Sequence, residues 1–288
     1  MGSAKRPARL PDFLIVGAMK AGTTSLFDWL GLQPEVFVPQ MKEPNFFCED
    51  HAWSRGSNWY ASLFRDASSD QHIGEASVGY TDPSRSALSA SRIESVLPGV
   101  RLLFVARDPV ERARSHYRHA VLRGREKRTL SEALAAADSP YVERSLYYRC
   151  LEPYLERFPR EQICVGTFES LFGPDEAGWG EVLRFIGLAP RARPATHRNA
   201  SAEREQFSPT MRLLWDAGVR KVPGAVPSFA RRAVKPLLFR RSPDPLLRTA
   251  EGPFPRRTIE GFAQDSELLR QWVGAPDPYW NFETAETR

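Results

Sequence analysis

Apolar residues occur in short, unbroken runs that alternate with amphipathic stretches. The first run, Phe13–Gly17, is rich in branched residues and follows Pro11 and Asp12. A continuous apolar run of this length, bounded by turn residues, predicts a strand buried on both faces of a parallel sheet. Thr23–Ser25 then opens an amphipathic stretch to Leu30 that a glycine ends, which predicts a helix with a hydroxyl cap.

The same alternation recurs along the chain. Arg101–Ala106 predicts a second buried strand, and Asp108 with Pro109 begins a helix that runs to about Arg123. Strands alternating with helices predict an α/β fold, specifically a P-loop-like three-layer fold with a central parallel sheet flanked by helices. Further strands are predicted at His72–Ala76 and Gln162–Phe168, and further helices at Pro83–Leu97, Ser131–Ala137, Ser145–Phe158 and Glu181–Ile186.

No shift in composition divides the chain, so residues 1–288 are predicted to form a single domain. Residues 1–11 are interpreted as an N-terminal tail. The region 190–256 is rich in proline and arginine, and we expect it to pack on the core as a loop-rich lid. It contains one predicted helix, Pro209–Ala217, and a last helix near Thr258–Val273 completes the fold.

The formal net charge is +5 and the isoelectric point is about 9.2. A basic protein suits a polyanionic ligand, but charge alone does not distinguish nucleic acid, anionic lipid and a phosphorylated cofactor. No basic run interleaved with aromatic residues and no zinc-finger spacing is present, so a nucleic-acid partner is not expected. The three cysteines are far apart and no apolar run reaches membrane-spanning length, so a soluble, cytoplasmic protein is expected.

Gly17–Ser25 lies at the predicted turn from the first strand into the first helix. A P-loop has the pattern G-x-x-x-x-G-K-[ST]. The two glycines fit this pattern, but Lys20 stands two residues before the second glycine and Thr23 occupies the usual lysine position. Backbone N–H groups at a helix start still attract an anion, helped by the helix dipole. We therefore expect this loop to bind a 5′-phosphate-like group, with Lys20 reaching toward it.

A second anion site is predicted where the second buried strand ends. Arg107 follows that strand directly, and Ser115 lies about two turns into the next helix. The carboxyl ends of parallel strands line one crevice, so Arg107 is expected beside Lys20. Its guanidinium suits forked recognition of a phosphate. A local ion pair of Arg107 with Asp108 or Glu111 is the alternative.

Together these motifs resemble those of the sulfotransferases that depend on PAPS (3′-phosphoadenosine 5′-phosphosulfate). Lys20–Ser25 is similar to the 5′-phosphosulfate loop of that family, and Arg107 with Ser115 is similar to its 3′-phosphate site. Met41–Phe47 resembles the heparan-sulfate-type and related bacterial members, in which a glutamate of this stretch acts as a base. Arg144–Tyr148 and the helix after it resemble the same branch.

The resemblance, which covers about residues 12–190, implies a cofactor and roles for individual residues. PAPS would donate a sulfuryl group and leave as PAP, with no metal expected. Glu43 would be the general base, and Lys20 would stabilise the leaving phosphate. The predicted cofactor-binding residues are Lys20, Ala21, Gly22, Thr23, Thr24, Ser25, Arg107, Ser115 and Arg198, and the predicted acceptor-binding residues are Lys42, Glu75 and Tyr147.

One position departs from the family pattern. Many of these relatives carry Glu-Lys after the second strand, whereas here Glu75 is followed by Ala76. The missing lysine shifts its work to Lys20, Lys42 or Glu75.

The expected acceptor is a hydroxyl, or less readily an amine, of a carbohydrate, glycolipid or natural product. One alternative is a P-loop kinase, which would need Lys-Ser/Thr at the end of the loop and an acidic magnesium ligand. Another is a non-catalytic PAP-binding protein, which the alanine at position 76 would suit. No transmembrane segment is expected. Basic and apolar residues in 222–245 leave peripheral membrane contact open, and the oligomeric state is also open.

Overall fold

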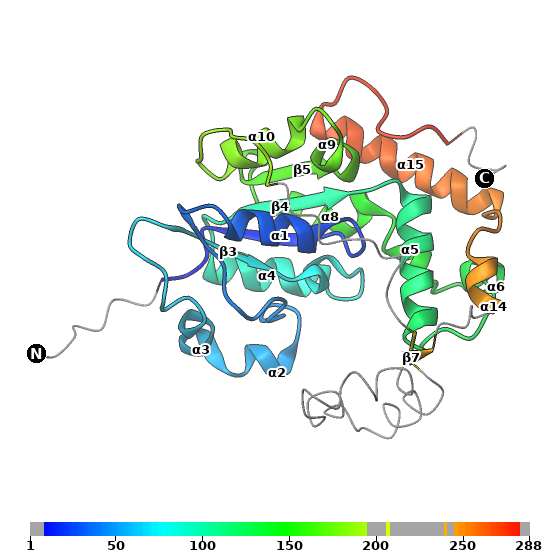
Figure 1. The fold of residues 1–288 in the computed structure, drawn as a ribbon, viewed down its shortest axis with the longest axis horizontal. Helices are drawn as coiled ribbons and strands as arrows, with labels where there is room; N and C mark the ends of the chain where they lie inside the picture. Colours follow the sequence, from blue (N-terminus) through cyan, green and yellow to red (C-terminus); the bar gives the residue numbers. More distant parts are fainter. Residues whose placement is uncertain (1–8, 195–205, 208–238, 241–244, 283–288) are drawn as a thin grey trace, which may run out of the picture.

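The computed structural model describes residues 9–194, 206–207, 239–240 and 245–282. Its centre is a parallel sheet of five strands in the order β2–β3–β1–β4–β5. The middle position of β1 places the turn after it at the centre of the sheet's carboxyl edge (Figure 1). The strands are β1 (Phe13–Gly17), β2 (Val36–Phe37), β3 (His72–Ala76), β4 (Arg101–Ala106) and β5 (Ile163–Thr167), with a separate antiparallel pair β6 (Gln206–Phe207) and β7 (Phe239–Arg240).

Helices cover the sheet on both faces, which confirms the predicted α/β fold (Figure 1). The first group is α1 (Thr23–Gly31), α2 (Asp50–Trp53), α3 (Gly56–Ser62), α4 (Ser86–Val96), α5 (Pro109–Leu122), α6 (Leu130–Ala135) and α7 (Pro140–Glu143). The second group is α8 (Tyr147–Leu155), α9 (Phe168–Phe172), α10 (Ala177–Phe185), α14 (Pro245–Thr249) and α15 (Arg256–Val273). Two 3₁₀ turns, η1 (Val78–Thr81) and η2 (Arg160–Gln162), precede α4 and β5.

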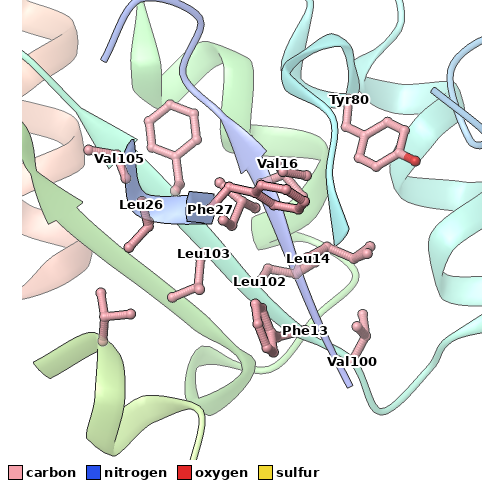
Figure 2. Close-up of a cluster of buried hydrophobic side chains, with 14 of the residues drawn as sticks. Phe13, Leu14, Val16, Leu26, Phe27, Tyr80, Val100, Leu102, Leu103 and Val105 are labelled. Carbon is pink, nitrogen blue, oxygen red and sulfur yellow. The ribbon is translucent and has the colours of Figure 1, made fainter. Parts of the chain in front are cut away.

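The central strands form the core because both of their faces are apolar. Along β1, the residues from Phe13 to Val16 are at most 1% exposed. Figure 2 shows Leu14 and Val16 of β1 among side chains of β4 and of helix α1. On the α1 side, Trp29 packs against Phe172 of α9 and against α10, with 4.8 Å between the first two ring centroids. This packing fixes α1, and with it the β1–α1 turn, against the sheet.

Helices α5, α6 and α14 stand together at one end of the sheet (Figure 1). They share a second cluster of buried apolar side chains with α15, among them Tyr117, Leu130 and Phe262. Tyr117 donates a hydrogen bond to the carbonyl of Arg128 at 2.9 Å. Helix α5 is therefore held by contacts with α6, α14 and α15.

Within the described residues, the predicted strands and helices coincide with observed ones, with ends that differ by up to four residues. The short helices α2, α3, α7, α9 and α14 and the strands β2, β6 and β7 were not predicted. β2 was not predicted because its two residues, Val36 and Phe37, are too few to show the alternation or the apolar run that identifies a strand. The predicted hydroxyl cap of α1 is wrong. Its N-cap is Gly22, with a left-handed φ of 88° and no side-chain hydrogen bond, so Thr23 already lies in the helix.

Some predictions fall on residues that the structure does not describe. The helix predicted at Pro209–Ala217 lies there, as does most of the predicted lid at 190–256, including Arg198. Among the described residues, no helix is both long enough and apolar enough to cross a membrane.

Candidate active site

A pocket of about 470 Å³ opens where the turn after β1 faces the start of α5. Both predicted anion sites border this space, together with the loop that follows β2. Residues far apart in the sequence thus meet at the carboxyl ends of neighbouring strands. The lining residues are Met19, Lys20, Gly22, Thr23, Thr24, Glu43, Val78, Arg107, Ser115, Arg118, His119 and Phe168.

Gly22 shapes the turn between β1 and α1. Its φ of 88° lies in the left-handed region, and a β-carbon there would come within 2.7 Å of the Phe172 ring. Glycine is therefore required by both the backbone and the packing. The first N–H groups of a helix have no intrahelical acceptor. Because Thr23 and Thr24 line the pocket from the first turn of α1, this end of the helix is suited to an anion.

The remaining residues of this turn divide into two groups. Lys20 lines the pocket and has a positive φ of 72°. Ala21 and Ser25 are buried, at 0% and 4% exposure, and are not part of the pocket lining. Their predicted cofactor contacts stay untested, and their observed place is in the packing behind the turn.

Arg107 follows β4 directly, and several groups hold its side chain. Its Nη1 donates a hydrogen bond of 3.4 Å to the carbonyl of Lys20, and its guanidinium lies 4.8 Å from the ring centroid of Phe168. The backbone carbonyl of Arg107 accepts a hydrogen bond of 2.7 Å from the Tyr147 hydroxyl. The alternative ion pair, with Glu111, is present at 3.8 Å and partly exposed. Arg107 nevertheless lines the pocket, so the pair does not withdraw it from a ligand.

Helix α5 supplies a second wall of the pocket. The Asp108 carboxylate caps it by accepting hydrogen bonds from two backbone N–H groups, the first at 2.9 Å from Val110. Residues three and four apart share one face of a helix. Arg118 and His119 therefore join Ser115 on the pocket wall. The basic side chains that line the pocket are Lys20, Arg107 and Arg118.

His116 is adjacent to Ser115 but does not line the pocket. It is 8% exposed, and its ring contacts that of Tyr141 edge-on, with 4.8 Å between centroids. Burial, followed by the nearby charge of Arg112, lowers the pKa of His116 to about 2. This histidine is neutral at physiological pH and packs inside the protein.

Glu43 lines the pocket from the loop after β2. Its φ of 62° is positive, and its backbone N–H donates a 3.0 Å hydrogen bond to the carbonyl of Ala76. The Lys42 ammonium lies 2.9 Å from Glu43 Oε1. Glu43 is therefore both an ion-pair partner and a pocket residue, and Lys42 contacts the pocket only through it.

The other two predicted acceptor-binding residues are not on the pocket surface. Glu75 is 0% exposed, and its carboxylate accepts hydrogen bonds from Tyr60, Ser77 and Tyr80. Burial raises the pKa of Glu75 to about 7. Tyr147 is also fully buried, and its hydroxyl is bound to the carbonyl of Arg107. In the described structure neither side chain is open to an acceptor, because both are buried behind the pocket surface.

Sequence reasoning missed five residues of the lining. Arg118 and His119 could have been found, because they follow Ser115 by three and four positions on a predicted helix. Val78 and Phe168 each lie just past the carboxyl end of a strand, which is also a readable signal. Met19 follows the same rule, because it lies two positions past the end of β1.

The described residues contain no cluster of metal-ligating side chains. In residues 9–194 and 245–282, no group of three or more histidine, cysteine, aspartate or glutamate side chains is placed to hold a metal ion. The polar side chains that line the pocket are hydroxyls, one lysine, two arginines, one histidine and one carboxylate.

Comparison with known proteins identifies the family. The family described as "Sulfotransferase domain" matches residues 10–210. Human bifunctional heparan sulfate N-deacetylase/N-sulfotransferase 2 is 30% identical over 202 residues, which cover 63% of this chain and 22% of that protein. Human heparan sulfate glucosamine 3-O-sulfotransferase 6 is 32% identical over 187 residues, which cover 62% of this chain and 53% of that protein.

A solved structure agrees with this assignment at the level of the fold. The sulfotransferase from Alicyclobacillus acidocaldarius superposes with a TM-score of 0.64 at 24% identity, covering 92% of this chain and 96% of the other. The match to the family spans the sheet, the β1–α1 turn and α5, which build the pocket. This chain belongs to the sulfotransferase family.

Proposed function

We propose that this protein transfers the sulfuryl group of PAPS to a hydroxyl, or less readily an amine, of a carbohydrate, glycolipid or natural product. The observation that carries the proposal is that one pocket contains both anion sites and a carboxylate. Lys20 and the start of α1 form one site, Arg107 and Ser115 form the other, and Glu43 lies on the same surface. A donor with two phosphate positions and a reacting acceptor need such an arrangement.

In this proposal the nucleotide is held by its two phosphates. The 5′-phosphosulfate lies on the β1–α1 turn, where Lys20 and the N–H groups of α1 meet it. The 3′-phosphate lies against Arg107 and Ser115, because a guanidinium binds phosphate through paired hydrogen bonds. The ring of Phe168 beside Arg107 offers an apolar face to the adenosine.

The transfer itself is an in-line displacement at sulfur. The bond from sulfur to the 5′-phosphate oxygen breaks, the bond to the acceptor oxygen or nitrogen forms, and PAP leaves. Negative charge grows on the leaving phosphate, where Lys20 and the helix N–H groups stabilise it. Position 76 is a buried alanine, so this protein lacks the lysine that many relatives carry there. The neighbouring Glu75 is also buried and does not replace that lysine at the reacting group.

Glu43 accepts the proton that the acceptor loses. A general base must lie within hydrogen-bond reach of that proton, and Glu43 is the acidic residue of the pocket lining. Lys42, at 2.9 Å, orients its carboxylate at the pocket rim. The names of the two human relatives, an N-sulfotransferase and a 3-O-sulfotransferase of heparan sulfate, support a carbohydrate acceptor and leave amine and hydroxyl both open.

The direct test is transfer of labelled sulfate from PAPS to a panel of glycan, glycolipid and small hydroxylated acceptors. We expect labelled product with at least one acceptor, and full activity in EDTA, because Lys20 supplies the charge that a kinase takes from magnesium. Parallel reactions with labelled ATP test the kinase alternative. Activity lost in EDTA and restored by magnesium, with phosphate rather than sulfate transferred, would overturn the proposal.

The non-catalytic alternative makes a different prediction. A protein that only binds PAP would bind it in calorimetry but transfer no sulfate to any member of the panel. Glu43→Gln serves as the inactive reference, since it keeps the shape of the side chain and loses the base.

A further inference from the structure

The loop that carries Glu43 has an unusual backbone. Between Met41 and Phe47, both Glu43 and Asn45 have positive φ, at 62° and 53°. Asparagine tolerates this region better than most residues, but glutamate does not. Such conformations persist only where the surrounding structure holds them. The contacts of this loop therefore determine where the Glu43 carboxylate points.

Two hydrogen bonds tie the loop to the end of β3. The N–H of Glu43 donates to the carbonyl of Ala76, and the N–H of Asn45 donates to the Ser77 hydroxyl, each at 3.0 Å. The first contact uses only backbone. The second depends on the direction of one side-chain hydroxyl, because Ser77 must present a lone pair to Asn45.

Glu75 sets the direction of that hydroxyl. Ser77 Oγ donates its proton to Glu75 Oε1 at 2.6 Å, which leaves its lone pairs for the N–H of Asn45. Glu75 Oε2 accepts from Tyr80 at 2.7 Å and from Tyr60 at 3.0 Å. Three hydroxyl donors thus converge on one carboxylate, and Glu75 and Ser77 are both fully buried. The chain of contacts runs from Glu75 through Ser77 to the loop.

This carboxylate does not contribute to stability through its charge. Burial is the main cause that raises the pKa of Glu75 to about 7, and the Glu43 carboxylate raises it further. A carboxyl with a folded pKa above its unfolded value of about 4.5 stabilises the fold only while it is protonated, and this benefit is lost between about pH 4.5 and 7. The other titratable groups around it are Tyr60, Tyr80, Tyr154 and Cys48. Ionised Glu75 therefore carries a folding cost at neutral pH, which its three hydrogen bonds offset only in part because they lower the pKa less than burial raises it.

We infer that Glu75 is a positioning residue, which acts through Ser77 to hold the Met41–Phe47 loop in the conformation that presents Glu43 to the pocket. The effect on catalysis rests on the proposed function, in which Glu43 is the base. The tether, by which we mean the hydrogen bonds from Glu75 through Ser77 to Asn45, does not depend on that role. It assigns Glu75 a place behind the base rather than contact with the acceptor.

Ser77→Ala tests the tether, with Ser266→Ala as the matched control. Ser266 is a buried serine of α15 whose hydroxyl has no hydrogen-bond partner within the described residues. Hydrogen exchange measured by NMR should show faster exchange at the Asn45 amide in Ser77→Ala only. The transfer rate kcat should fall roughly 3- to 10-fold, the loss expected for one hydrogen bond, while PAP affinity is unchanged.

Glu75→Gln provides a second variant and a readout that simple destabilisation would not produce. In the wild type, kcat should increase as pH rises through about 7, because ionised Glu75 accepts the Ser77 proton. Glu75→Gln should lose this step while its thermal stability at pH 8 is kept. An unchanged pH profile in Glu75→Gln would overturn the inference.

The double variant Glu43→Gln/Ser77→Ala separates this inference from the proposed function. If Ser77 acts through Glu43, adding Ser77→Ala to Glu43→Gln should cause no further loss of kcat. A further loss of the full size would overturn the positioning role. If the wild type transfers no sulfate, the proposed function fails. The hydrogen-exchange rate of the Asn45 amide then tests the tether without any activity measurement. Unchanged exchange in Ser77→Ala, or the same change in Ser266→Ala, would overturn it.

Discussion

The two sides of the pocket are built in different ways. The side proposed to bind the nucleotide, called the nucleotide side here, consists of the turns that follow β1 and β4 and of the helices α1 and α5 that begin at those turns. The side that carries Glu43 is a loop without helix or strand, tied to β3 by hydrogen bonds from residues more than 30 positions away. The first side takes its geometry from the sheet. The second depends on long-range contacts.

This difference has a chemical counterpart. Phosphate binding uses N–H groups and fixed positive charges, which any strand-to-helix turn of the right shape can supply. Proton transfer needs one carboxylate at one position, so a small displacement of Glu43 matters more than a small displacement of Lys20. Substitutions on the two sides should therefore separate turnover from nucleotide binding.

The largest effect is expected on the loop side. Glu43→Gln should lower kcat about 10²–10⁴-fold, because glutamine cannot accept the proton of the acceptor. Its affinity for PAP should stay near the wild-type value, measured by calorimetry. Lys42→Met is the control, since it removes the 2.9 Å ion pair and keeps the carboxylate. A near wild-type kcat in Glu43→Gln would show that the base lies elsewhere.

A smaller effect is expected on the nucleotide side. Arg107→Ala should weaken PAP binding by about 1.5–3 kcal/mol, the range for hydrogen bonds to a charged group. Arg107→Lys keeps the charge without the planar fork and should recover only part of this loss. Calorimetric titration with PAP measures both. Equal PAP affinity in the wild type and in Arg107→Ala would show that Arg107 does not bind the 3′-phosphate.

The smallest effect is expected behind the nucleotide side. Tyr147→Phe leaves the Arg107 carbonyl without its 2.7 Å donor and should lower the free energy of unfolding by about 0.5–1.5 kcal/mol. PAP affinity should fall less than in Arg107→Ala. Urea unfolding measures the stability, with Tyr148→Phe on the same helix as the control. A greater loss of PAP affinity in Tyr147→Phe than in Arg107→Ala would mean that Tyr147 contacts the ligand in the complex.

Much of the nucleotide side could be predicted from the sequence. The bounds of β1 and β4 follow from their unbroken apolar runs, and the start of α5 follows from Asp108 and Pro109. Lys20, Arg107 and Ser115 then follow from their offsets relative to those elements. The prediction of the α1 cap failed because a glycine in the left-handed region replaces a hydroxyl, and this depends on the nearby Phe172 ring.

The loop side could be predicted only in part. A resemblance in Met41–Phe47 identified Glu43, but neither its place in the pocket nor its positive φ follows from local pattern. Glu75 and Tyr147 were assigned to the acceptor site, yet both are buried and hydrogen-bonded behind the pocket. A polar residue gives no periodic signal that tells a pocket wall from a buried network.

The sequence by itself determined the strands β1, β3, β4 and β5, the principal helices between them and the positions of the two turns predicted to bind anions, because apolar periodicity, caps and turn residues act over a few positions. Only the tertiary structure decided which residues meet. It brought Glu43 and Ser115 to one pocket, added Arg118 and His119 to its wall, and enclosed Glu75 among hydroxyl groups. The physical reason is that hydrogen bonds and burial between distant segments depend on how layers pack around the sheet, which no local pattern records.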